Sequence, residues 1–448
     1  MIEPRRPYLT ILLATFNEAG NIADVIESIR RAIASTTDDY EILVVDAGSP
    51  DGTQEIAARS GARVLVQQRR GYGAALAEGL AAAHGENIVT LDADRSHDPF
   101  YIPALLRALR HADVAIGSRY VRFAFADMPW IRKALSKTLN VAFARFLDLP
   151  FRDISSGYRA YRRRALEGLE LRGTNYEVLE ELLVKIHAHG HRIVEVPIHY
   201  HPRGEGSSKV RWLAFGWSFS RALIRLWKLR NSVYSADYDE RAFYSLVLPQ
   251  RMWQRKRYRV IHALLDKRGP ILDVGCGSSM IAMSLPQSVG LDIQLKKLRY
   301  LRQLGLDLIR GSIRKLPFED RSFDEVICSQ VIEHIPPEWF DLREFSRVLS
   351  DDGVLVLGTP DYARKSWLFT EWVYGKVMPG AYADEHITHY TRASLEAQLR
   401  AHGFEIEAVR YVYMGELVIR ARKRTPQPPA PVTAAAGAES PAVTSGST

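Results

Sequence analysis

The chain has 448 residues, of which 46% are hydrophobic and 25% are charged, a balance that excludes an overall disordered or fibrous protein. Its length exceeds what one hydrophobic core usually supports, so we predict two domains. The two cysteines, Cys276 and Cys328, each lie in an apolar run, which excludes a disulfide framework or a cysteine metal cluster. A reducing cytoplasm is therefore expected.

The N-terminal apolar run meets Asn17 and Glu18 before any small-residue cleavage site, which is unlike a signal peptide. No stretch of 18 or more uncharged apolar residues occurs, which argues against a membrane-spanning helix. We expect a cytoplasmic protein that is peripheral on the inner face of the membrane. Residues 424–448 are rich in Pro, Ala, Ser and Thr and predict a disordered tail.

The net charge of +8 is distributed unevenly along the chain. Residues 1–231 carry 32 Lys+Arg against 26 Asp+Glu, and residues 232–448 carry 28 against 26. The basic excess of the first half favours phosphorylated small molecules and anionic lipid as partners. Nucleic acid is not expected as a partner, because no helix-turn-helix, zinc-finger or RNP-like segment accompanies the basic excess.

In the first half, apolar β-rich runs alternate with helical patterns. Strands are predicted at YLTILLAT, EILVVD, ARVLVQ and NIVTLDAD, with helices starting near residues 21, 52 and 72. This alternation predicts a parallel sheet whose ligands bind at the carboxyl ends of the strands. Three polar segments lie at such ends, namely residues 15–18, 46–53 and 92–94.

The last of these segments contains two acids, Asp92 and Asp94, separated by one residue. Both carboxylates can reach one hard divalent cation that bridges a diphosphate. A solvated loop with two acids is the alternative interpretation.

Seven segments between about residues 8 and 209 extend this pattern: TFNEAGNI, VVDAGSPDGT, DADRSHDP, GSRY, DISSGYRAYRR, YEVLEELLVK and VPIHYHPRGEGSSK. In this order they resemble the GT-A fold of family 2 glycosyltransferases, in particular the dolichyl- or polyprenyl-phosphate mannosyltransferases. The resemblance implies metal-dependent, inverting transfer of a sugar from a nucleotide-sugar to a polyprenyl phosphate. GDP-mannose is the first choice of donor, and UDP-glucose or another UDP-sugar is the alternative.

The same resemblance implies roles for particular residues. The base and ribose would contact Thr15, Asn17, Glu18 and Asp46, and Mg²⁺ or Mn²⁺ would be held by Asp92, Asp94 and Ser96. The acceptor phosphate would be bound by Arg119, Arg132 and Arg203, with Lys209 also on the substrate side. Asp153 would position or deprotonate the acceptor, or alternatively cap a loop, and the catalytic residues would be Asp94, Asp153, Arg119 and Arg203. Ala47 departs from the family, whose members usually have a second aspartate there.

Residues 209–236 predict a basic amphipathic helix and a linker. Residues 209–231 hold six basic side chains, no acidic ones and three tryptophans, which is typical of a helix lying in an anionic membrane interface. The alternative is a helix packed on the sheet with a solvated basic face. The apolar stripe is Trp212, Phe215, Phe219, Leu223 and Leu226, opposite Ser218, Arg221, Arg225 and Lys228.

A second βα series follows, with strands predicted at PILDVGCG, SVGLDI, SFDEVICSQ and GVLVLGTP. The turn containing Asp273, Gly275 and Gly277 ends the first of these strands, and Asp292 ends the next. Such a turn can receive the polar end of a nucleoside cofactor at a helix start. Binding of NAD, or a plain tight turn, is the alternative interpretation.

Further segments, including RGSIRKLPFEDRSFDEVICSQVIEHI and HITHYTRASLEAQLRAHGFEIEAV, resemble class I S-adenosylmethionine-dependent methyltransferases over about residues 240–423. The resemblance implies that Asp273, Gly275 and Gly277 bind the methionine end, Asp292 the ribose, and Ser312 with Ile313 the adenine. Ser279 and Ser312 depart from the family's usual glycine and aspartate. The methyl acceptor would be a related glycan, lipid or small molecule. His334 is a candidate base or a loop support, and His386 and His389 are equally plausible near the substrate.

The predicted protein therefore has two doubly wound α/β domains: an N-terminal GT-A nucleotide-sugar-binding fold and a C-terminal Rossmann-like class I methyltransferase fold. Predicted boundaries are 1–208, 209–236, 237–423 and 424–448. A bifunctional enzyme is the leading hypothesis. The alternative keeps a glucosyl or other UDP-sugar transferase and makes the second domain a non-catalytic scaffold.

Overall fold

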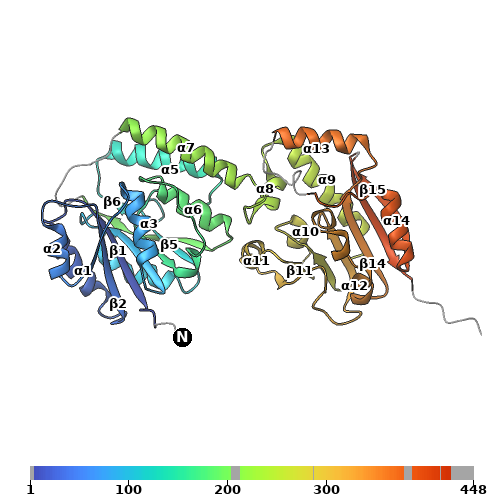
Figure 1. Ribbon diagram of the computed structural model, residues 1–448, viewed down its shortest axis with the longest axis horizontal. Helices are drawn as coiled ribbons and strands as arrows, with labels where there is room; N and C mark the ends of the chain where they lie inside the picture. Colours follow the sequence, from blue (N-terminus) through green and yellow to red (C-terminus); the bar gives the residue numbers. More distant parts are fainter. Residues whose placement is uncertain (1–4, 203–211, 286, 378–385, 414, 425–448) are drawn as a thin grey trace, which may run out of the picture.

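The structure is a computed structural model that describes residues 5–202, 212–285, 287–377, 386–413 and 415–424. Figure 1 shows two α/β domains, with the first domain in blue to green and the second in yellow to red. The chain passes from one to the other between helices α7 (Trp212–Arg230) and α8 (Tyr238–Tyr244). Apart from Arg424, the predicted tail at 424–448 lies outside the described residues.

The first domain contains a seven-stranded sheet in the order β3-β2-β1-β4-β7-β5-β8. Strand β7 is antiparallel to both neighbours, and the other neighbouring strands are parallel. Its elements are β1 (Leu9–Thr15), α1 (Ile22–Ile33), β2 (Tyr40–Asp46), α2 (Thr53–Arg59), β3 (Arg63–Val66), α3 (Tyr72–Ala82), β4 (Asn87–Asp92), α4 (Ile102–Ala108), β5 (Val114–Ser118), β6 (Phe125–Ala126), α5 (Trp130–Leu147), β7 (Arg159–Arg162), α6 (Val178–Ala188), β8 (Ile193–Pro197) and β9 (His199–Tyr200).

Strand β1 shows why this sheet forms. Successive side chains of a strand point to opposite faces, so a run that is apolar at every position needs cover on both sides. Ile11 and Leu13 pack with residues of α1 and α4, whereas Leu12 packs with residues of α3 and α6. Helices on both faces thus bury the strand completely, as predicted for a doubly wound sheet.

Helix α7 (Trp212–Arg230) packs on the first domain along α5 and α6. Phe219 and Leu226 are buried and Leu223 is partly buried, with Phe143 of α5 in ring contact with Phe219. The prediction that this apolar stripe lies in a membrane interface is therefore wrong for these three side chains, because the protein core already covers them. The side chains of Trp212, Phe215 and Ser218 lie outside the described part of the chain.

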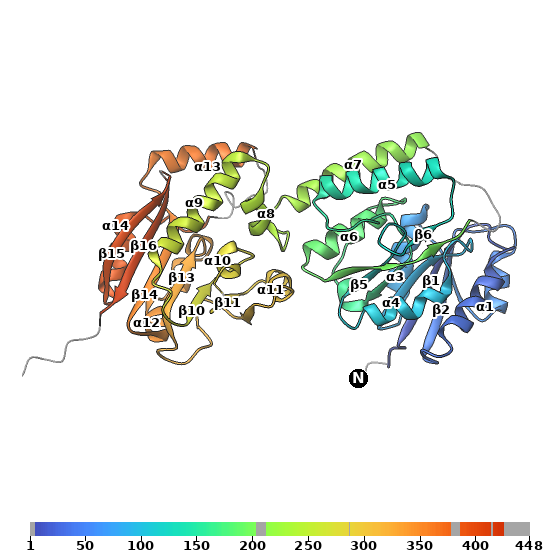
Figure 2. The ribbon, with the colours of Figure 1, turned by 180° about the vertical axis from the view of Figure 1, so that it is seen from behind.

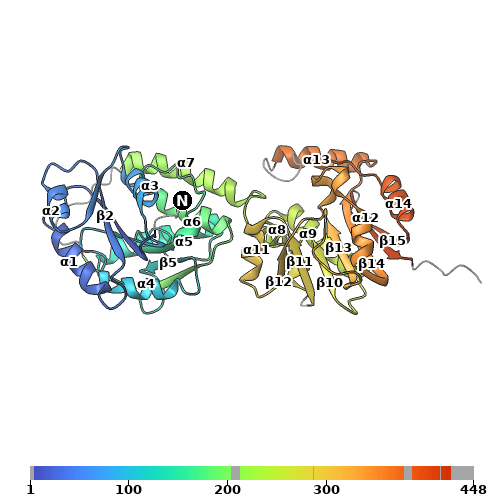
Figure 3. The same cartoon turned by 60° about the horizontal axis from the view of Figure 1, so that its bottom comes forward.

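The end of α7 is fixed by a buried ion pair between Arg230 and Asp237. Two nitrogens of the guanidinium lie 2.7 Å from the two carboxylate oxygens, and Arg230 also donates to the carbonyls of Leu147 and Asp148. On the other side of the junction, Gln303 donates to the carbonyl of Gly190. The bond from Gln303 ties the end of α11 (Leu295–Arg302) to the first domain, which α11 faces in Figure 3.

The second domain also has a seven-stranded sheet, in the order β12-β11-β10-β13-β14-β16-β15. Strand β16 is antiparallel to both β14 and β15, and the first five strands are parallel. Its elements are α8 (Tyr238–Tyr244), α9 (Leu248–Leu264), β10 (Ile271–Val274), α10 (Met280–Met283), β11 (Ser288–Asp292), α11 (Leu295–Arg302), β12 (Asp307–Arg310), β13 (Phe323–Ser329), α12 (Leu342–Val348), β14 (Leu349–Pro360), α13 (Lys365–Val377), α14 (Arg392–Ala401), β15 (Phe404–Val412) and β16 (Glu416–Lys423).

Helices cover both faces of this sheet as well. Residues of α12 and α14 pack on one face, and residues of α9 and α10 pack on the other (Figure 2). The prediction of two doubly wound α/β domains is thus confirmed. Within the described residues, none of the helices is long and apolar enough to span a bilayer.

Candidate active sites

The first candidate site lies at the carboxyl ends of β2, β1 and β4, where Thr15 pairs in register with Asp46 and Ala14 with Asp92. Asp46 is buried, and its oxygens accept hydrogen bonds from Thr15, Ser49 and Gln54. Burial by itself raises the pKa of Asp46, but the bonds from Ser49, Thr15 and Gln54 outweigh it and hold the pKa below its usual value. The ionised carboxylate shapes the loop after β2.

The loop after β1 is tied to the same loop. The backbone N–H of Asn17 donates to Ser49 Oγ at 2.8 Å, and that of Glu18 donates to Thr53 Oγ1 at 2.9 Å. Asn17 adopts a left-handed φ of 55°, a conformation that asparagine tolerates better than most residues. The predicted nucleoside-binding residues therefore form one rigid edge, because Asp46 and its neighbours cross-link both loops.

Asp92 and Asp94 follow β4 at the same sheet edge. The Asp92 side chain is 36% exposed, whereas Asp94 is buried and one of its oxygens accepts from the N–H (3.0 Å) and hydroxyl (2.5 Å) of Ser96. Two carboxylates at a strand end form an all-oxygen donor set that suits Mg²⁺ or Mn²⁺. The hydroxyl of Ser96 is already used in orienting Asp94.

His97 also belongs to this edge, although no predicted role fell on it. The buried imidazole lies against Tyr158 and Tyr200, and its Nδ1 accepts the backbone N–H of Asp92 at 3.1 Å. Burial lowers the pKa of His97, which keeps the ring neutral and Nδ1 free to accept. His97 therefore fixes the backbone from which the Asp92 carboxylate projects.

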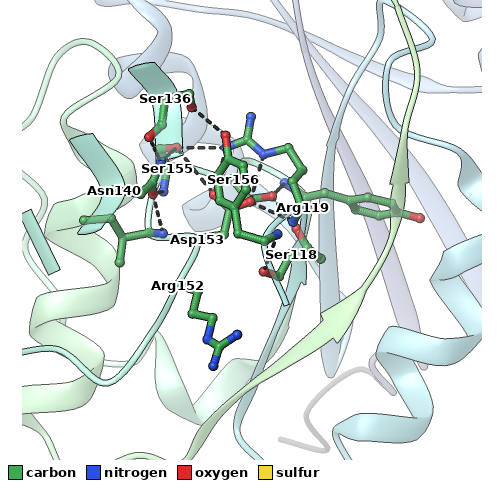
Figure 4. A network of polar contacts seen from close by, with 12 residues as sticks. Ser118, Arg119, Ser136, Asn140, Arg152, Asp153, Ser155 and Ser156 are labelled. Atoms are coloured by element: carbon green, nitrogen blue, oxygen red, sulfur yellow. Dashed lines mark hydrogen bonds and ion pairs between the residues drawn. The ribbon is translucent and has the colours of Figure 1, made fainter. Parts of the chain in front are cut away.

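Arg119 and Asp153 form a buried bidentate pair next to this edge, shown with its polar neighbours in Figure 4. The backbone N–H and Nε of Arg119 donate to one carboxylate oxygen at 2.9 and 2.8 Å, and Nη2 donates to the other at 2.7 Å. Burial by itself lowers the pKa of the Arg119 guanidinium, but the Asp153 carboxylate overrides that effect and holds the pKa above its usual range. The guanidinium is thus held in its charged form against the carboxylate.

Helix α5 supports this pair from above. Asn140 accepts the backbone N–H of Ile154 and donates to Ser155, which in turn accepts from Arg119. Arg132 lies about one helical turn before Ser136 and two turns before Asn140. Residues four positions apart share a helix face, so these three side chains lie on the same side of α5. The exposed Arg132 therefore lies on the face of α5 that meets the pair. Arg203 and Lys209 lie outside the described residues.

The second candidate site lies at the carboxyl ends of β10 and β11. Gly275 and Gly277 have left-handed φ angles of 70° and 57°, which other residues adopt only at a cost. The N–H of Gly277 donates to Asp292 at 2.8 Å, so the glycine turn and the acidic strand end form one unit. Asp292 lies at the position predicted for a ribose-binding carboxylate.

Asp273 supplies a test of whether this turn suits S-adenosylmethionine. Its side chain is buried, and Oδ2 has no hydrogen-bond partner among the described residues. Burial, followed by repulsion from Asp292, raises the pKa of Asp273 to about 7. A buried, unsatisfied carboxylate suits the cationic amino group of the cofactor's methionine end, so the residues present fit the cofactor.

Two further segments border the turn. Asp239 of α8 accepts from the N–H and hydroxyl of Ser278 and from Lys297, so α8 covers the glycine loop. After β12, the N–H of Gly311 donates to the carbonyl of Asp292. That bond brings the loop with Ser312 and Ile313 beside Asp292, although the Ile313 side chain packs in the core.

The sequence model of the glycosyl transferase family 2 matches residues 10–169, and that of a methyltransferase domain matches residues 272–357. A polyprenol monophosphomannose synthase of Mycolicibacterium smegmatis is 37% identical over 215 residues, 45% of this chain and 80% of that protein. The chain belongs to glycosyl transferase family 2. It carries a methyltransferase domain in its second half.

Other relatives support the same assignment. A dolichyl-phosphate hexose transferase of Haloferax volcanii is 33% identical over 49% of this chain and 93% of that protein. A dolichol-phosphate mannosyltransferase of Pyrococcus furiosus is 31% identical over 50% of this chain, which spans 65% of that protein, somewhat less than two thirds. The resemblance predicted from the motifs is thus confirmed.

Solved structures are similar to about half of the chain. One of them is a glucosyl-3-phosphoglycerate synthase from Mycobacterium tuberculosis in complex with Mn²⁺, uridine-diphosphate and phosphoglyceric acid. The identity is 25%, with coverage of 50% of this chain and 78% of that chain, and the TM-score is 0.39. A TM-score this low carries no functional inference.

In this family 2 chain, Gly71 and Gly73 allow close packing between two segments of the protein. The sequence pattern predicts that Gly71 and Gly73 let the backbone approach phosphates. A Cβ on Gly73 would instead lie 2.6 Å from the carbonyl oxygens of Gly173 and Asn175. Gly71 likewise meets the backbone of Thr174, so both glycines allow α3 to pack closely on the loop before α6.

His97 and Asp239 are the residues that sequence reasoning missed. The signal for His97 was its place in DADRSHDP, three residues after Asp94, but a lone histidine after an acidic motif has no fixed role. Asp239 carried no local signal, because its partner Ser278 lies 39 residues away. The remaining predicted contacts to substrate and cofactor stay predictions.

Proposed function

We propose that the first domain transfers a hexose, with mannose from GDP-mannose as first choice, to a polyprenyl phosphate. The support is that three relatives named for polyprenol-linked or dolichol-linked sugar transfer match 50%, 45% and 49% of the chain. Asp92 and Asp94 would hold Mg²⁺ or Mn²⁺, which neutralises charge on the departing nucleoside diphosphate. The acceptor phosphate attacks C1 directly and inverts the anomeric centre.

In this proposal the acceptor phosphate needs alignment more than deprotonation, because its second pKa of about 6 leaves it largely ionised at pH 7. Asp153 is fully buried and holds both oxygens on Arg119, which suits a positioning residue rather than a base. The contacts with Asp153 use Nε and Nη2 of Arg119 and leave Nη1 for a phosphate oxygen. Arg132 and Arg203 would complete the phosphate contacts.

The test is transfer of labelled mannose from GDP-mannose to a short polyprenyl phosphate by the purified chain with Mg²⁺ or Mn²⁺. Asp94→Asn should reduce transfer by about a hundredfold or more, since it removes one metal ligand charge. Asp24→Asn, an exposed acid on α1, is the matched control and should transfer like wild type. Failure with every donor would overturn the acceptor assignment.

A second donor deserves the same assay, because the Haloferax volcanii relative is named for hexose rather than mannose. UDP-glucose is therefore tried in parallel. Transfer from UDP-glucose alone would keep the polyprenyl-phosphate acceptor and reject mannose.

We further propose that the first domain rests on an anionic membrane surface through α5 and α7, which lie side by side in Figures 1 and 2. Residues 128–147 contain four basic and no acidic side chains. Phe146 and Trp227 bring the two helices together, with ring centroids 6.3 Å apart. The exposed apolar side chains of this face are Trp130, Ile131, Leu135, Leu139 and Phe146 of α5 with Ile224 and Trp227 of α7.

Such a face suits an interfacial protein, since exposed aromatic side chains flanked by lysine and arginine partition into anionic headgroups. The proposed membrane contact is thus the exposed side of the α5/α7 pair. The apolar stripe predicted from α7 alone cannot serve, because its described side chains are buried. Sedimentation with phosphatidylglycerol-containing vesicles tests this proposal. The pair of substitutions Trp130→Asp and Trp227→Asp should abolish binding, and a wild-type chain that stays in the supernatant would refute it.

For the second domain we propose S-adenosylmethionine-dependent methylation of a glycan, lipid or small molecule of the same pathway. Asp273 and Asp292, together with the glycine turn, are the groups that support binding of the cofactor. Calorimetry with S-adenosylmethionine should show binding by wild type and about tenfold weaker binding by Asp292→Ala, since one charge-assisted bond is lost. Absence of binding would favour the non-catalytic scaffold.

A further inference from the structure

Three metal-ligating side chains meet in the second domain beyond the carboxyl end of β13. Glu333 and His334 belong to the 3-10 turn Ile332–His334, and His386 comes from the segment that leads to α14. One ligand atom from each of the three lies within 4.8 Å of the others.

Glu333 supplies independent support for a ligand at this place. The side chain is fully buried, and Oε2 accepts from Thr359 Oγ1 at 3.1 Å. Oε1 has no hydrogen-bond partner among the described residues. An unsatisfied buried acceptor costs about 1–3 kcal/mol, and a cation at Oε1 would offset that cost.

His386 is oriented as metal-binding histidines usually are. Its Nδ1 lies 2.6 Å from Glu371 Oε1 and 2.7 Å from the hydroxyl of Tyr362. Donation from Nδ1 to Glu371 leaves Nε2 as an acceptor for a metal. A carboxylate behind the histidine fixes the ring and its tautomer in this way in many metal sites.

The cluster lies beside the cofactor turn. The backbone N–H groups of Ile387 and Thr388 donate to the carbonyl of Glu333 at 2.8 and 3.0 Å, which holds the His386 segment in place. A Cβ on Gly275 would collide with Val331, two residues before Glu333. The three ligands therefore lie next to the turn proposed for S-adenosylmethionine, where a methyl acceptor must approach.

We propose that Glu333, His334 and His386 bind a divalent transition metal whose open position takes a hydroxyl oxygen of the methyl acceptor. Two imidazoles and one carboxylate favour Zn²⁺, Co²⁺ or Fe²⁺ over Mg²⁺, and three protein ligands leave a position for substrate. The role in methylation rests on the proposed function of the second domain, whereas the metal site does not.

Methyl transfer at this site needs only the acceptor alcohol and S-adenosylmethionine as reactants. A metal-bound hydroxyl loses its proton to water more readily, as metal-bound water does. The alkoxide oxygen then forms a bond to the methyl carbon while the bond from that carbon to the sulfonium sulfur breaks, leaving a neutral thioether. The acceptor class is therefore an alcohol or phenol.

The test is titration of the chelator-stripped full chain with Co²⁺, followed by visible absorption, in an Asp94→Asn background that removes one carboxylate of the first-domain pair. One Co²⁺ per chain is expected. Glu333→Gln and His386→Ala should weaken binding by more than about tenfold, and Glu371→Gln by roughly tenfold to a hundredfold through the ring it holds. The control His402→Ala, an exposed histidine of the same domain, should bind like the background protein.

Calorimetry with S-adenosylmethionine on the same proteins separates the two proposals. Cofactor binding without Co²⁺ binding would overturn the metal site and leave the methyltransferase function. Co²⁺ binding without cofactor binding would support the site and reject its role in methylation. Co²⁺ affinity unchanged in Glu333→Gln and His386→Ala would also overturn the metal site.

A different observation concerns the outer face of α13, where Leu368, Phe369, Trp372 and Val373 are exposed. Phe369 and Trp372 are 66% and 63% exposed, and their rings stack at 6.2 Å. Figures 1 and 2 both place α13 on the same side of the molecule as α5 and α7. Helices α5, α7 and α13, each of which carries exposed aromatic side chains, therefore lie on one side of the molecule.

Helix α9 adds charge beside α13, which it meets through Trp253 and Trp367, 6.1 Å apart. Helix α9 contains five basic and no acidic residues, of which Arg257 is paired with Glu416. Leu246, Val247, Leu248 and Met252 are exposed at the start of α9. Apolar side chains next to a basic stretch fit the headgroup region of an anionic bilayer.

We infer that the second domain contacts the same anionic membrane as the first, which makes a membrane-borne molecule the methyl acceptor. This inference rests on the membrane contact proposed for the first domain. In vesicle flotation, the pair Phe369→Asp and Trp372→Asp should weaken binding several-fold, while Leu304→Asp, an exposed leucine after α11, should not.

Flotation of the Phe369→Asp and Trp372→Asp protein at the wild-type level would overturn the second-domain contact. If the Trp130→Asp and Trp227→Asp pair still abolished binding, the first-domain contact would stand. Loss of binding in both pairs, with cofactor affinity retained, supports a shared membrane surface.

Discussion

Asp153 accepts three hydrogen bonds from Arg119, one from its backbone N–H and two from its guanidinium, so a single residue occupies both oxygens of a fully buried carboxylate. Arg119 in turn lies over the rings of Tyr120 and Tyr200, at 5.2 and 5.5 Å. An acid held in this way positions the arginine, and the arginine remains the group that can meet a phosphate.

Asp153→Asn should lower the free energy of unfolding of the first domain by about 3–5 kcal/mol, because it leaves a buried guanidinium without its counter-charge. Arg119→Gln should cost a similar amount, and the double variant should cost much less than the sum. Urea unfolding of the four proteins measures this coupling. Additive losses would show that the pair is not a unit, and a normal unfolding curve for Asp153→Asn with abolished transfer would instead indicate a catalytic base.

The junction between the domains depends on Arg230 and Asp237. Burial opposes ionisation of Asp237, but His187 and Arg230 hold its pKa well below the usual range. Asp237→Asn should destabilise the chain by about 3–5 kcal/mol and expose residues 231–237 to limited proteolysis, because a buried charge loses its partner. Asp148→Asn is the matched comparison, since Asp148 pairs with Arg241 but is 67% exposed, and should cost less than about 1 kcal/mol.

Asp273 predicts a dependence of stability on pH. Its pKa of about 7 in the folded protein lies above the ordinary value of 3.8, so between these values the folded state binds more protons than the unfolded state. The free energy of unfolding should therefore fall as pH rises from about 4 through 7, by an amount on the order of 4 kcal/mol.

Asp273→Asn cannot titrate and should lack this fall. Because burial also raises the pKa of Glu333 to about 8, the difference between the two proteins, measured by thermal unfolding at several pH values, isolates Asp273. Parallel curves for wild type and Asp273→Asn would contradict the prediction.

The close backbone packing at Gly73 predicts that an added methyl group lowers the free energy of unfolding. Gly73→Ala should destabilise the first domain by roughly 1–3 kcal/mol, because the new methyl group meets backbone atoms that cannot rotate away. Gly48→Ala is the comparison, since no atom lies within 4 Å of its Cβ position and only its φ of 78° is unfavourable. Thermal unfolding should show the larger loss for Gly73→Ala, and equal losses would assign the effect to conformation alone.

The sequence by itself determined both sheets and the strand ends that carry the chemistry. Residues such as Ile11, Leu12 and Leu13 are apolar at consecutive positions, and only burial on both faces satisfies such a run, so the pattern specifies a covered parallel sheet. Asp46 and Asp92 end strands of the first sheet, and Asp292 ends a strand of the second. In each sheet, parallel strands bring their carboxyl ends to one edge. Local pattern was sufficient in these cases.

Only the tertiary structure decided which side chains bind other groups of the protein rather than a ligand. Asp153 and Arg119 are 34 residues apart, and no local pattern shows that they neutralise each other. Glu333 and His386 meet because Ile387 and Thr388 donate to the carbonyl of Glu333 across 54 and 55 residues. The amphipathic pattern of α7 likewise predicts an apolar stripe, but it does not predict what buries that stripe. Lipid or a neighbouring helix can bury an apolar face equally well, so only the packing in the folded protein distinguishes the two.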